Sequence, residues 1–554
     1  MAEEAWLGGV VGAAAAAWFV RKGLVRLRLS RAKAKGAPGH VRWAKRMAGF
    51  IPFYEFTGEA FFRADDAPDE VVALRQAGLA RLSALYHERY PKTGALTAEM
   101  RDSIPDIAFT GRYRVPFQFS RVMRESLPSG SFYAKSEGIT VTDLDGNEFY
   151  DLTGSYGVNL LGTDAYRAMI AAGTETAAAL GPLLGGLHPV TADNVRRLQA
   201  ISGLDAVSFH MSGTEAVMQA VRLARYHTRR KHVVRFAGAY HGWWGDVQPG
   251  IGNPLPAEHT YTLADMSEAT LKVLATRKNI ACVLVNPLQA MHVNKNAPGD
   301  SALVDSSRRS GVDREAYATW LARLRETCTK AGIVLIVDEV FTGFRLAPRG
   351  ACEYFGIAPD MVTYGKTLGG GLPVGVLCGR ADLMQRYRED RPADICFARG
   401  TFNSHPYVMG AMDAFLRWHA SEAAAAAYDG VDERWNARAA ALNAALESEG
   451  LSPRVGNLGT VWSVHYTVPS RYNWMLQYYL RAEGVALGWT GTGRFIFSLA
   501  YGEAEFAEVQ ARVLAAVRAF EADGWAWAAP GTENKALRRR ILREVLAARR
   551  GTMR

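Results

Sequence analysis

The chain has 554 residues, 49% of them hydrophobic and 22% charged, with a formal net charge of +10 at pH 7. This length indicates two or three domains, and the composition is that of a globular protein rather than a disordered one. The five cysteines are Cys282, Cys328, Cys352, Cys378 and Cys396, and no two of them form a Cys-x-x-Cys pair. Their odd number and wide spacing argue against a disulfide framework or a zinc cluster, so no metal site is expected. Cysteines of this kind fit a reducing compartment.

The N-terminal end contains an uncharged stretch over residues 5–20. A membrane-spanning helix needs about 20 residues, but the long side chains of Arg21 and Lys22 can snorkel and extend this one. We therefore expect residues 1–48 to form a membrane anchor followed by a basic segment. The alternative is an alanine-rich helix that packs on the protein's own surface.

Residues 21–46 contain ten lysines or arginines and no acidic residue. The positive-inside rule places such a segment, and the large remainder of the chain, on the cytoplasmic side of a membrane, where it would meet anionic lipid. A cleavable signal peptide does not fit, because its basic residues precede the apolar stretch instead of following it.

Two segments lie between this end and the main domain: a helical extension over residues 49–109, and the first part of a small domain over residues 110–160. A helix is predicted from Pro68 to Tyr86, because a proline and two acids open it and apolar residues recur at helical spacing. Residues 138–152 alternate around an Asp-Gly pair, which is typical of a β-hairpin.

Residues 161–414 carry the pattern of a large α/β domain. The segments 333–337 and 361–364 are short apolar runs rich in β-branched residues, typical of strands buried on both faces of a parallel sheet. Asp338 and Lys366 follow these strands at the edge where open α/β sheets bind ligands. Taken alone, such residues more commonly cap a turn or face solvent.

A strand-end carboxylate and a lysine are the groups that pyridoxal phosphate (PLP) chemistry needs. The lysine amine holds PLP as a Schiff base, and the carboxylate keeps the pyridine nitrogen protonated so that the ring accepts electrons. Upstream, Ser212, Gly213 and Thr214 precede a helical pattern, and the free amide groups of a helix N-terminus bind phosphate. The same three residues also make an ordinary N-cap.

Five motifs run in order over about residues 110–520: Met211-Ser-Gly-Thr-Glu-Ala, Ala239-Tyr-His-Gly-Trp, Val337-Asp-Glu-Val-Phe-Thr-Gly-Phe-Arg345, Tyr364-Gly-Lys-Thr-Leu-Gly-Gly-Gly-Leu-Pro-Val-Gly375 and Arg399-Gly-Thr-Phe-Asn-Ser-His-Pro406. In this order the chain resembles class III PLP-dependent aminotransferases of fold type I, especially glutamate-1-semialdehyde aminomutase-like members. The resemblance implies an α/β fold with a large domain, whose mostly parallel sheet is covered by helices. A smaller α+β domain, completed by residues 415–524, and the N-terminal helical extension accompany it.

The resemblance also implies roles for single residues. Lys366 would form the Schiff base and shuttle a proton, and Asp338 would pair with the pyridinium nitrogen. Thr401 would reach the phosphate of the neighbouring subunit, which implies a homodimer with shared active sites. Further cofactor contacts are implied for Val340 behind the ring, Tyr240 on its exposed face, His241, and the phosphate-binding Ser212, Gly213 and Thr214. The alternatives are packing roles for Tyr240 and His241, and an N-cap role for Thr401.

One position departs from the family pattern. Asn286 stands where many members carry a glutamate, which in several relatives pairs with an arginine that otherwise grips a substrate carboxylate. The usual amino-acid substrate is therefore in doubt, and the amine donor stays open. With the expected anchor and aromatic residues such as Tyr156 and Trp243, this suggests a long-chain aldehyde, ketone or acyl thioester as the carbonyl acceptor. An aminomutase or racemase, and a non-catalytic membrane scaffold, are the alternatives.

Residues 525–554 form a basic tail. From Ala536 to Arg550, leucines and arginines recur at helical spacing, which fits an amphipathic helix on an anionic membrane surface. Nucleic acid also attracts basic helices, but it is not expected as a partner because no motif that reads nucleic acid accompanies this one.

Overall fold

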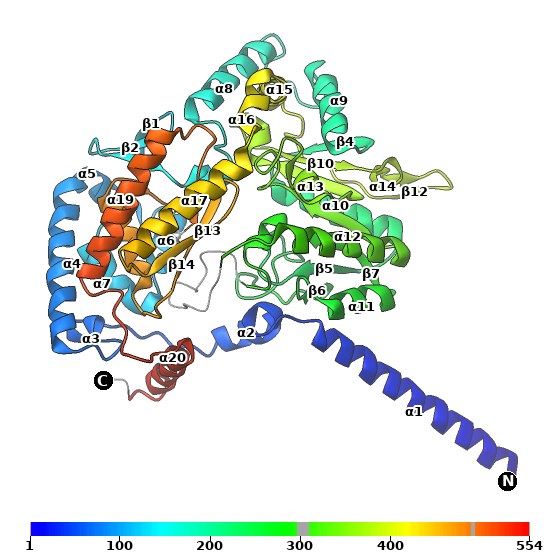
Figure 1. Cartoon of the computed structure of the whole chain (residues 1–554). Coiled ribbons are helices and arrows are strands. Elements are labelled where there is room, and N and C mark those ends of the chain that lie inside the picture. Colours follow the sequence, from blue (N-terminus) through cyan, green and yellow to red (C-terminus); the bar gives the residue numbers. More distant parts are fainter. Residues whose placement is uncertain (1, 296–309, 489–493, 553–554) are drawn as a thin grey trace.

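The computed structural model describes residues 2–295, 310–488 and 494–552. Its centre is a seven-stranded sheet in the order β4-β10-β9-β8-β7-β5-β6 (Figure 1). Strands β9, β8, β7, β5 and β6 run parallel, whereas β10 is antiparallel to both of its neighbours, so the predicted mostly parallel sheet is confirmed. The strands are β4 (Ala206–His210), β5 (His232–Phe236), β6 (Thr260–Leu263), β7 (Ile280–Val285), β8 (Val334–Asp338), β9 (Met361–Gly365) and β10 (Gly375–Gly379).

Helices cover both faces of this sheet. Along β8, Val334 and Ile336 join one apolar cluster with α10, while Leu335 and Val337 join another with α11 and α12. Successive strand residues face opposite sides, so a strand covered on both sides requires the unbroken apolar run that the sequence has. The covering helices are α10 (Gly213–Thr228), α11 (Glu268–Thr276) and α12 (Arg314–Ala331), with α8 (Thr163–Ala177), α9 (Val190–Ser202) and α15 (Pro406–His419) around the β4 end.

A second, smaller core combines segments from both ends of the chain. The parallel pairing of β15 with β3 joins residues 485–486 to residues 150–151, and the predicted hairpin at Asp145-Gly146 is confirmed by the antiparallel pair β2 and β3. Its elements are β1 (Tyr133–Glu137), β2 (Thr140–Asp143), β3 (Glu148–Asp151), β13 (Pro453–Leu458), β14 (Val461–Tyr466), β15 (Val485–Ala486), β16 (Arg494–Ile496), α17 (Val431–Ser448), α18 (Leu476–Ala482) and α19 (Glu503–Ala522).

The N-terminal extension packs into this smaller core. Helix α4 (Asp69–Arg89) begins after Pro68, as predicted, and its Leu79 and Tyr86 belong to the same apolar cluster as the C-terminal segments. Arg75 of α4 is fully buried, where its two terminal nitrogens donate to the carboxylate of Asp65 at 2.8 Å. A buried cation is tolerated there because it is paired and hydrogen-bonded.

The two ends of the chain carry the basic helices α1 (Ala2–Arg31), α2 (Val41–Ala48) and α20 (Asn534–Arg549). Helix α1 extends away from the body of the molecule, and its residues 13–28 are exposed all round (Figure 1). The helix itself was predicted, but its packing on the protein surface is excluded for these residues. Among residues 13–32, such packing is found only at the end of α1, where Leu29 is half-buried and Ala32, the residue after the helix, is buried.

The prediction that residues 5–20 span a membrane was wrong. Within residues 2–295, 310–488 and 494–552, no helix has both the length and the apolar character that a membrane crossing requires. The uncharged stretch is shorter than the about 20 residues of a span, and α1 continues from it into a strongly basic segment. The C-terminal part of α1 therefore carries the basic residues Arg21, Lys22, Arg26, Arg28 and Arg31.

Candidate active site

Two polar residues meet at the carboxyl edge of the central sheet. Asp338 is the last residue of β8, and Lys366 directly follows the neighbouring parallel strand β9. Lys366 has a backbone φ of 49°, in the left-handed region that residues other than glycine rarely adopt. Such a conformation persists only where the surroundings hold it, and it is concentrated at functional sites.

Asp338 is almost completely buried and accepts three hydrogen bonds. The backbone N–H of Val340 and the hydroxyl of Thr363 donate to Oδ1, each at 3.1 Å, and His241 Nδ1 lies 2.8 Å from Oδ2. Burial lowers the pKa of His241, against the opposing effect of Asp338. A neutral imidazole that donates from Nδ1 therefore fixes the orientation of the carboxylate.

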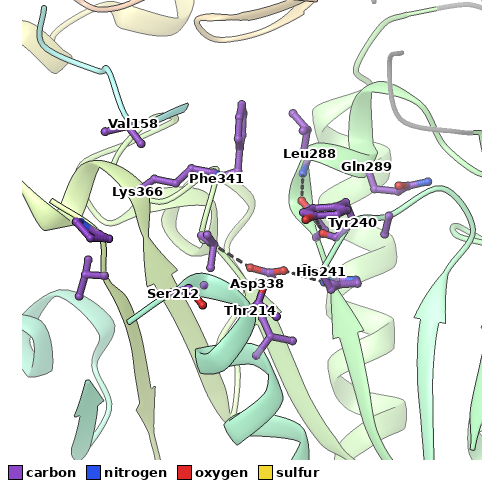
Figure 2. A pocket seen from close by; sticks show the side chains of 18 of the residues that line it. Val158, Ser212, Thr214, Tyr240, His241, Leu288, Gln289, Asp338, Phe341 and Lys366 are labelled. Atoms are coloured by element: carbon purple, nitrogen blue, oxygen red, sulfur yellow. Dashed lines mark hydrogen bonds and ion pairs between the residues drawn. The ribbon is translucent and has the colours of Figure 1, made fainter. Parts of the chain in front are cut away.

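Burial also lowers the pKa of Lys366, although the nearby Asp338 opposes the shift. Arg345 and Arg494 lower this pKa further through charge repulsion. A lysine with a lowered pKa is more often the uncharged amine, which is the nucleophilic form. The amine lies 5.6 Å from the centre of the Phe341 ring, and Figure 2 shows the two side chains next to each other.

The N-terminus of α10 opens into the same space. Ser212 is its N-cap, and the Ser212 Oγ accepts from the N–H of Glu215 at 3.3 Å, which leaves the first amide groups of the helix for a ligand. A Cβ atom on Gly213 would lie 2.5 Å from Val340 Cγ1, so only glycine fits between this helix and the loop after β8. The close approach of bare backbone makes a cradle suited to a phosphate group.

These groups line one cavity of about 660 Å³ (Figure 2). The predicted site residues on its wall are Ser212, Gly213, Thr214, Tyr240, His241, Asp338, Val340 and Lys366. Thr401 is exposed and does not line it. Because Thr401 was expected to reach the site of a neighbouring subunit, its role remains a prediction.

The cavity has further lining residues that sequence reasoning missed. They include Leu288, Gln289, His292, Leu372, Pro373 and Arg494, together with Phe341. Phe341 lies within a recognised motif, three residues after Asp338, and that position was the available signal. Arg494 begins the short strand β16 of the smaller core and carries no comparable local signal.

Asn286 has a structural use in this wall. Its amide nitrogen donates to the carbonyl oxygen of Tyr240 at 2.7 Å, and its side-chain oxygen accepts from the N–H of Leu288 at 3.1 Å. A glutamate could not donate the first of these bonds. Asn286, which departs from the family pattern, therefore stabilises the backbone that carries Tyr240.

One cavity contains a buried carboxylate held by a histidine, a lysine of lowered pKa and a phosphate cradle. These groups match the pyridine nitrogen, the aldehyde and the phosphate of PLP. The profile of the family described as aminotransferase class-III matches residues 122–516. The chain belongs to this family. It is a PLP-dependent aminotransferase, which moves an amino group between an amine donor and a carbonyl acceptor.

The relatives of this aminotransferase agree with the assignment. A glutamate-1-semialdehyde 2,1-aminomutase from Geotalea daltonii is 30% identical over 407 residues, covering 70% of this chain and 86% of the relative. A solved transaminase with PLP bound is 27% identical, with a TM-score of 0.60 over 76% of this chain and 98% of that chain. A glutamate-1-semialdehyde aminomutase from Pseudomonas aeruginosa shares the fold at 20% identity, with a TM-score of 0.64 over 81% and 99% of the two chains.

Arg345 connects the two cores of the aminotransferase behind the active site. Its guanidinium is fully buried and donates to the Thr460 hydroxyl at 2.9 Å and to the carbonyl of Phe497 at 2.8 Å. It also donates to the carbonyls of Gly157 and Asn159, at 3.2 and 3.1 Å. Burial lowers its pKa to about 10, so it stays charged at neutral pH and holds these segments together.

Proposed function

We propose that Lys366 is the catalytic lysine of this aminotransferase and that Asp338 is the partner of the cofactor's pyridine nitrogen. The observation that carries the proposal is the meeting of both residues in one cavity with the N-terminus of α10. Ser212, Gly213 and Thr214 bind the phosphate through the free amides of that helix. Bound PLP supplies an electron sink for charge that develops on the substrate carbon.

The protein side chains then have separate tasks. With PLP bound, Nζ of Lys366, whose pKa is lowered, would accept the proton from the substrate carbon on one side of the transferred nitrogen and donate it to the carbon on the other side. Asp338 keeps the ring nitrogen charged, and His241 holds that carboxylate in place from behind. Val340 and Tyr240 bound the space for the ring on its two sides.

Substitution of the lysine tests this assignment. Lys366→Ala should abolish the visible absorbance of the imine in the folded holoenzyme, whereas Lys330→Ala on the surface of α12 should leave it unchanged. Asp338→Asn should keep the fold and lower turnover by about 100- to 1,000-fold, the range for removal of one electrostatic contact at a reacting centre. An imine absorbance band that survives in Lys366→Ala would refute the role of that lysine.

We further propose that the carbonyl acceptor is hydrophobic: a long-chain aldehyde, ketone or acyl thioester. Support comes from the apolar side chains of Val158, Leu288, Phe341 and Leu372 around the cavity and from the neutral amide of Asn286. Each methylene that enters an apolar site contributes about 0.8 kcal/mol. The specificity constant kcat/KM should therefore rise about fourfold per added methylene while the chain still fits.

A homologous series of aldehydes measures this dependence. Phe341→Ala should flatten the rise with chain length, and Leu74→Ala on the exposed face of α4 should not change it. Equal kcat/KM values along the series, or a preference for short polar keto acids, would contradict the hydrophobic acceptor while leaving the role of Lys366 intact.

The similarity to glutamate-1-semialdehyde aminomutases favours a second candidate function, in which the amino group moves within one molecule. Incubation with an amine donor alone separates the two. A transferase should release close to one equivalent of carbonyl product per active site and then stop until an acceptor is added. An aminomutase or racemase should convert its substrate continuously, without any second substrate.

We propose that the enzyme works as a homodimer with shared active sites. Support comes from the exposed position of Thr401 outside its own cavity and from exposed aromatic side chains nearby in the chain, Phe397 and Phe402. Inactive Lys366→Ala subunits mixed with impaired Thr401→Ala subunits should regain activity, because each hybrid dimer has one complete site. Without recovery, despite subunit exchange, the sites are not shared.

We also propose that the enzyme works at the cytoplasmic face of a membrane, attached to its surface. The ten basic residues of segment 21–46, with no acidic residue among them, support this location. The protein should sediment with membranes after cell lysis and be released by high salt or carbonate. Protease added outside intact spheroplasts should leave residues 1–46 uncut.

A further inference from the structure

A second cavity, of about 820 Å³, lies between the N-terminal segment and the edge strand β6. Tyr261 and Leu263 of β6 contribute apolar wall, and the opposite wall comes from the end of α1 and from α2. The charged residues around it are Lys33, Arg42, Lys45, Arg46 and a single carboxylate, Glu258. The cavity is therefore apolar within and strongly cationic at its rim.

The frame of this cavity is fixed to the large domain. The N–H of Ala264 donates to the carbonyl of Ala32 at 2.7 Å, and Arg42 donates to the carbonyl of Ala257 at 3.2 Å. Ala32 and Ala34 are buried against the end of β6 and its neighbour. The basic residues thus stand on an anchored part of the chain, unlike the charges of a loose tail.

The cations of this rim are available to a ligand. Within the part of the chain that the structure describes, Lys33, Lys45 and Arg46 make no ion pair with a carboxylate, and Arg42 is bonded to a backbone carbonyl. Residues 5–54 contain no acidic residue that could neutralise them. Four cations around one carboxylate, Glu258, leave an excess of positive charge at the cavity that attracts an anion.

Exposed apolar side chains continue the surface beyond the cavity. Trp43, Phe50 and Phe53 are 58%, 51% and 61% exposed, and Arg549 of α20 lies 4.8 Å from the Phe50 ring. Helix α20 turns Leu542 and Leu546 to solvent as well. Helices α1, α2 and α20 all lie along the lower edge of the molecule in Figure 1. Aromatic and basic residues in such a mixture are typical of protein surfaces at a membrane interface.

We propose that the cavity beside β6, together with the exposed faces of α1, α2 and α20, docks on an anionic lipid bilayer and that the cavity takes a lipid headgroup. This inference rests on the proposed membrane location and identifies the surface responsible for it. A second copy of the chain is disfavoured as the occupant, because two segments of the same strong positive charge repel each other. Negative lipid attracts every one of these cations at once.

Vesicle flotation with the full-length holoenzyme tests the surface. One set of vesicles contains phosphatidylcholine alone, and the other contains phosphatidylglycerol as about a third of the lipid, an anionic surface that attracts basic segments. The unmodified enzyme should float with the anionic vesicles and lose most of this binding in high salt. The double variant Lys45→Gln, Arg46→Gln should bind about 30-fold more weakly, since each cation near the surface contributes about 1 kcal/mol.

A matched variant separates the surface from net charge. Lys92→Gln with Arg196→Gln removes the same two charges from α5 (Pro91–Met100) and from α9, and should bind like the unmodified enzyme. Both double variants should keep full activity, because none of these residues lines the active-site cavity. Trp43→Ser should remove part of the binding that remains in high salt.

The possible results separate the two proposals. If the unmodified enzyme ignores anionic vesicles, the membrane location and the docking surface both fail. If it binds but Lys45→Gln, Arg46→Gln binds equally well, the location stands and this surface is wrong. Dissociation of the double variant into monomers, measured by light scattering, would show a contact between copies and overturn the proposal, as would tighter binding to an RNA oligonucleotide than to the vesicles.

Discussion

The substitution Gly213→Ala should weaken PLP binding through a defined steric contact. The new Cβ would lie 2.5 Å from Cγ1 and 2.9 Å from Cγ2 of Val340, whereas ordinary contacts of this kind begin at 3.4 Å. Either the start of α10 or Val340 must therefore move by roughly 1 Å, and overpacking of this size costs about 1–3 kcal/mol. Because the phosphate cradle and the residue proposed to lie behind the ring are the two sides of this contact, the cost falls on cofactor affinity.

The expected change in the dissociation constant of PLP is a rise of about 5- to 150-fold, measured by absorbance titration of the apoenzyme. Val340→Ala removes both Cγ atoms, so the double variant should recover part of the affinity lost in Gly213→Ala. The two changes should be coupled by about 1–2 kcal/mol, as for residues in direct contact. Gly111→Ala is the control, because its Cβ would approach nothing closer than 3.7 Å. Strictly additive effects of the two substitutions would refute the steric reasoning.

Three further predictions concern stability and titration. Burial lowers the pKa of His210 to about 4, so as the pH falls the histidine is protonated in the unfolded chain before it is protonated in the folded one. Between pH 6.5 and about pH 4 the free energy of unfolding of the apoenzyme should therefore fall by about 3 kcal/mol. Urea unfolding of His210→Gln should show a smaller fall over the same pH range. Asp65→Ala leaves Arg75 buried without its partner and should cost about 3–5 kcal/mol, whereas Asp69→Ala at the exposed Arg63 pair should cost little; similar unfolding midpoints would contradict the difference in burial. In the apoenzyme, Lys366 should react with a small amine-directed reagent at lower pH than Lys330, as followed by peptide mass spectrometry; a higher pH for Lys366 would contradict its lowered pKa.

The elements that could be predicted from sequence are those with a local cause. The covered strands β8 and β9, helix α4 after Pro68, and the hairpin at Asp145-Gly146 each follow from the pattern of a few adjacent residues. The meeting of Asp338 and Lys366 also follows, because adjacent parallel strands end at one edge of a sheet.

Features that depend on distant segments escaped prediction. Arg494 reaches the active-site cavity from β16, and that placement depends on how the smaller core packs against the larger one. The shared core of the N-terminal extension and the C-terminal segments has the same origin. For residues 5–20, the prediction of a membrane span relied on the uncharged composition. The short length of the stretch and the basic residues next to it were given too little weight.

The bonds of Arg345 have a consequence for how the wall of the active-site cavity can be changed. Its contacts with the loop at residues 157–159, which brings Val158 to the wall of the cavity, are made to main-chain carbonyls, so they do not depend on the side chains of the loop. Substitution of Val158 can change the shape and polarity of the cavity wall while Arg345 holds the backbone of the loop in place. Asp338 and Lys366, at the ends of β8 and β9, belong to other segments and keep their positions in such a variant. The architecture therefore allows one wall of the cavity to change while the residues that hold the cofactor stay the same.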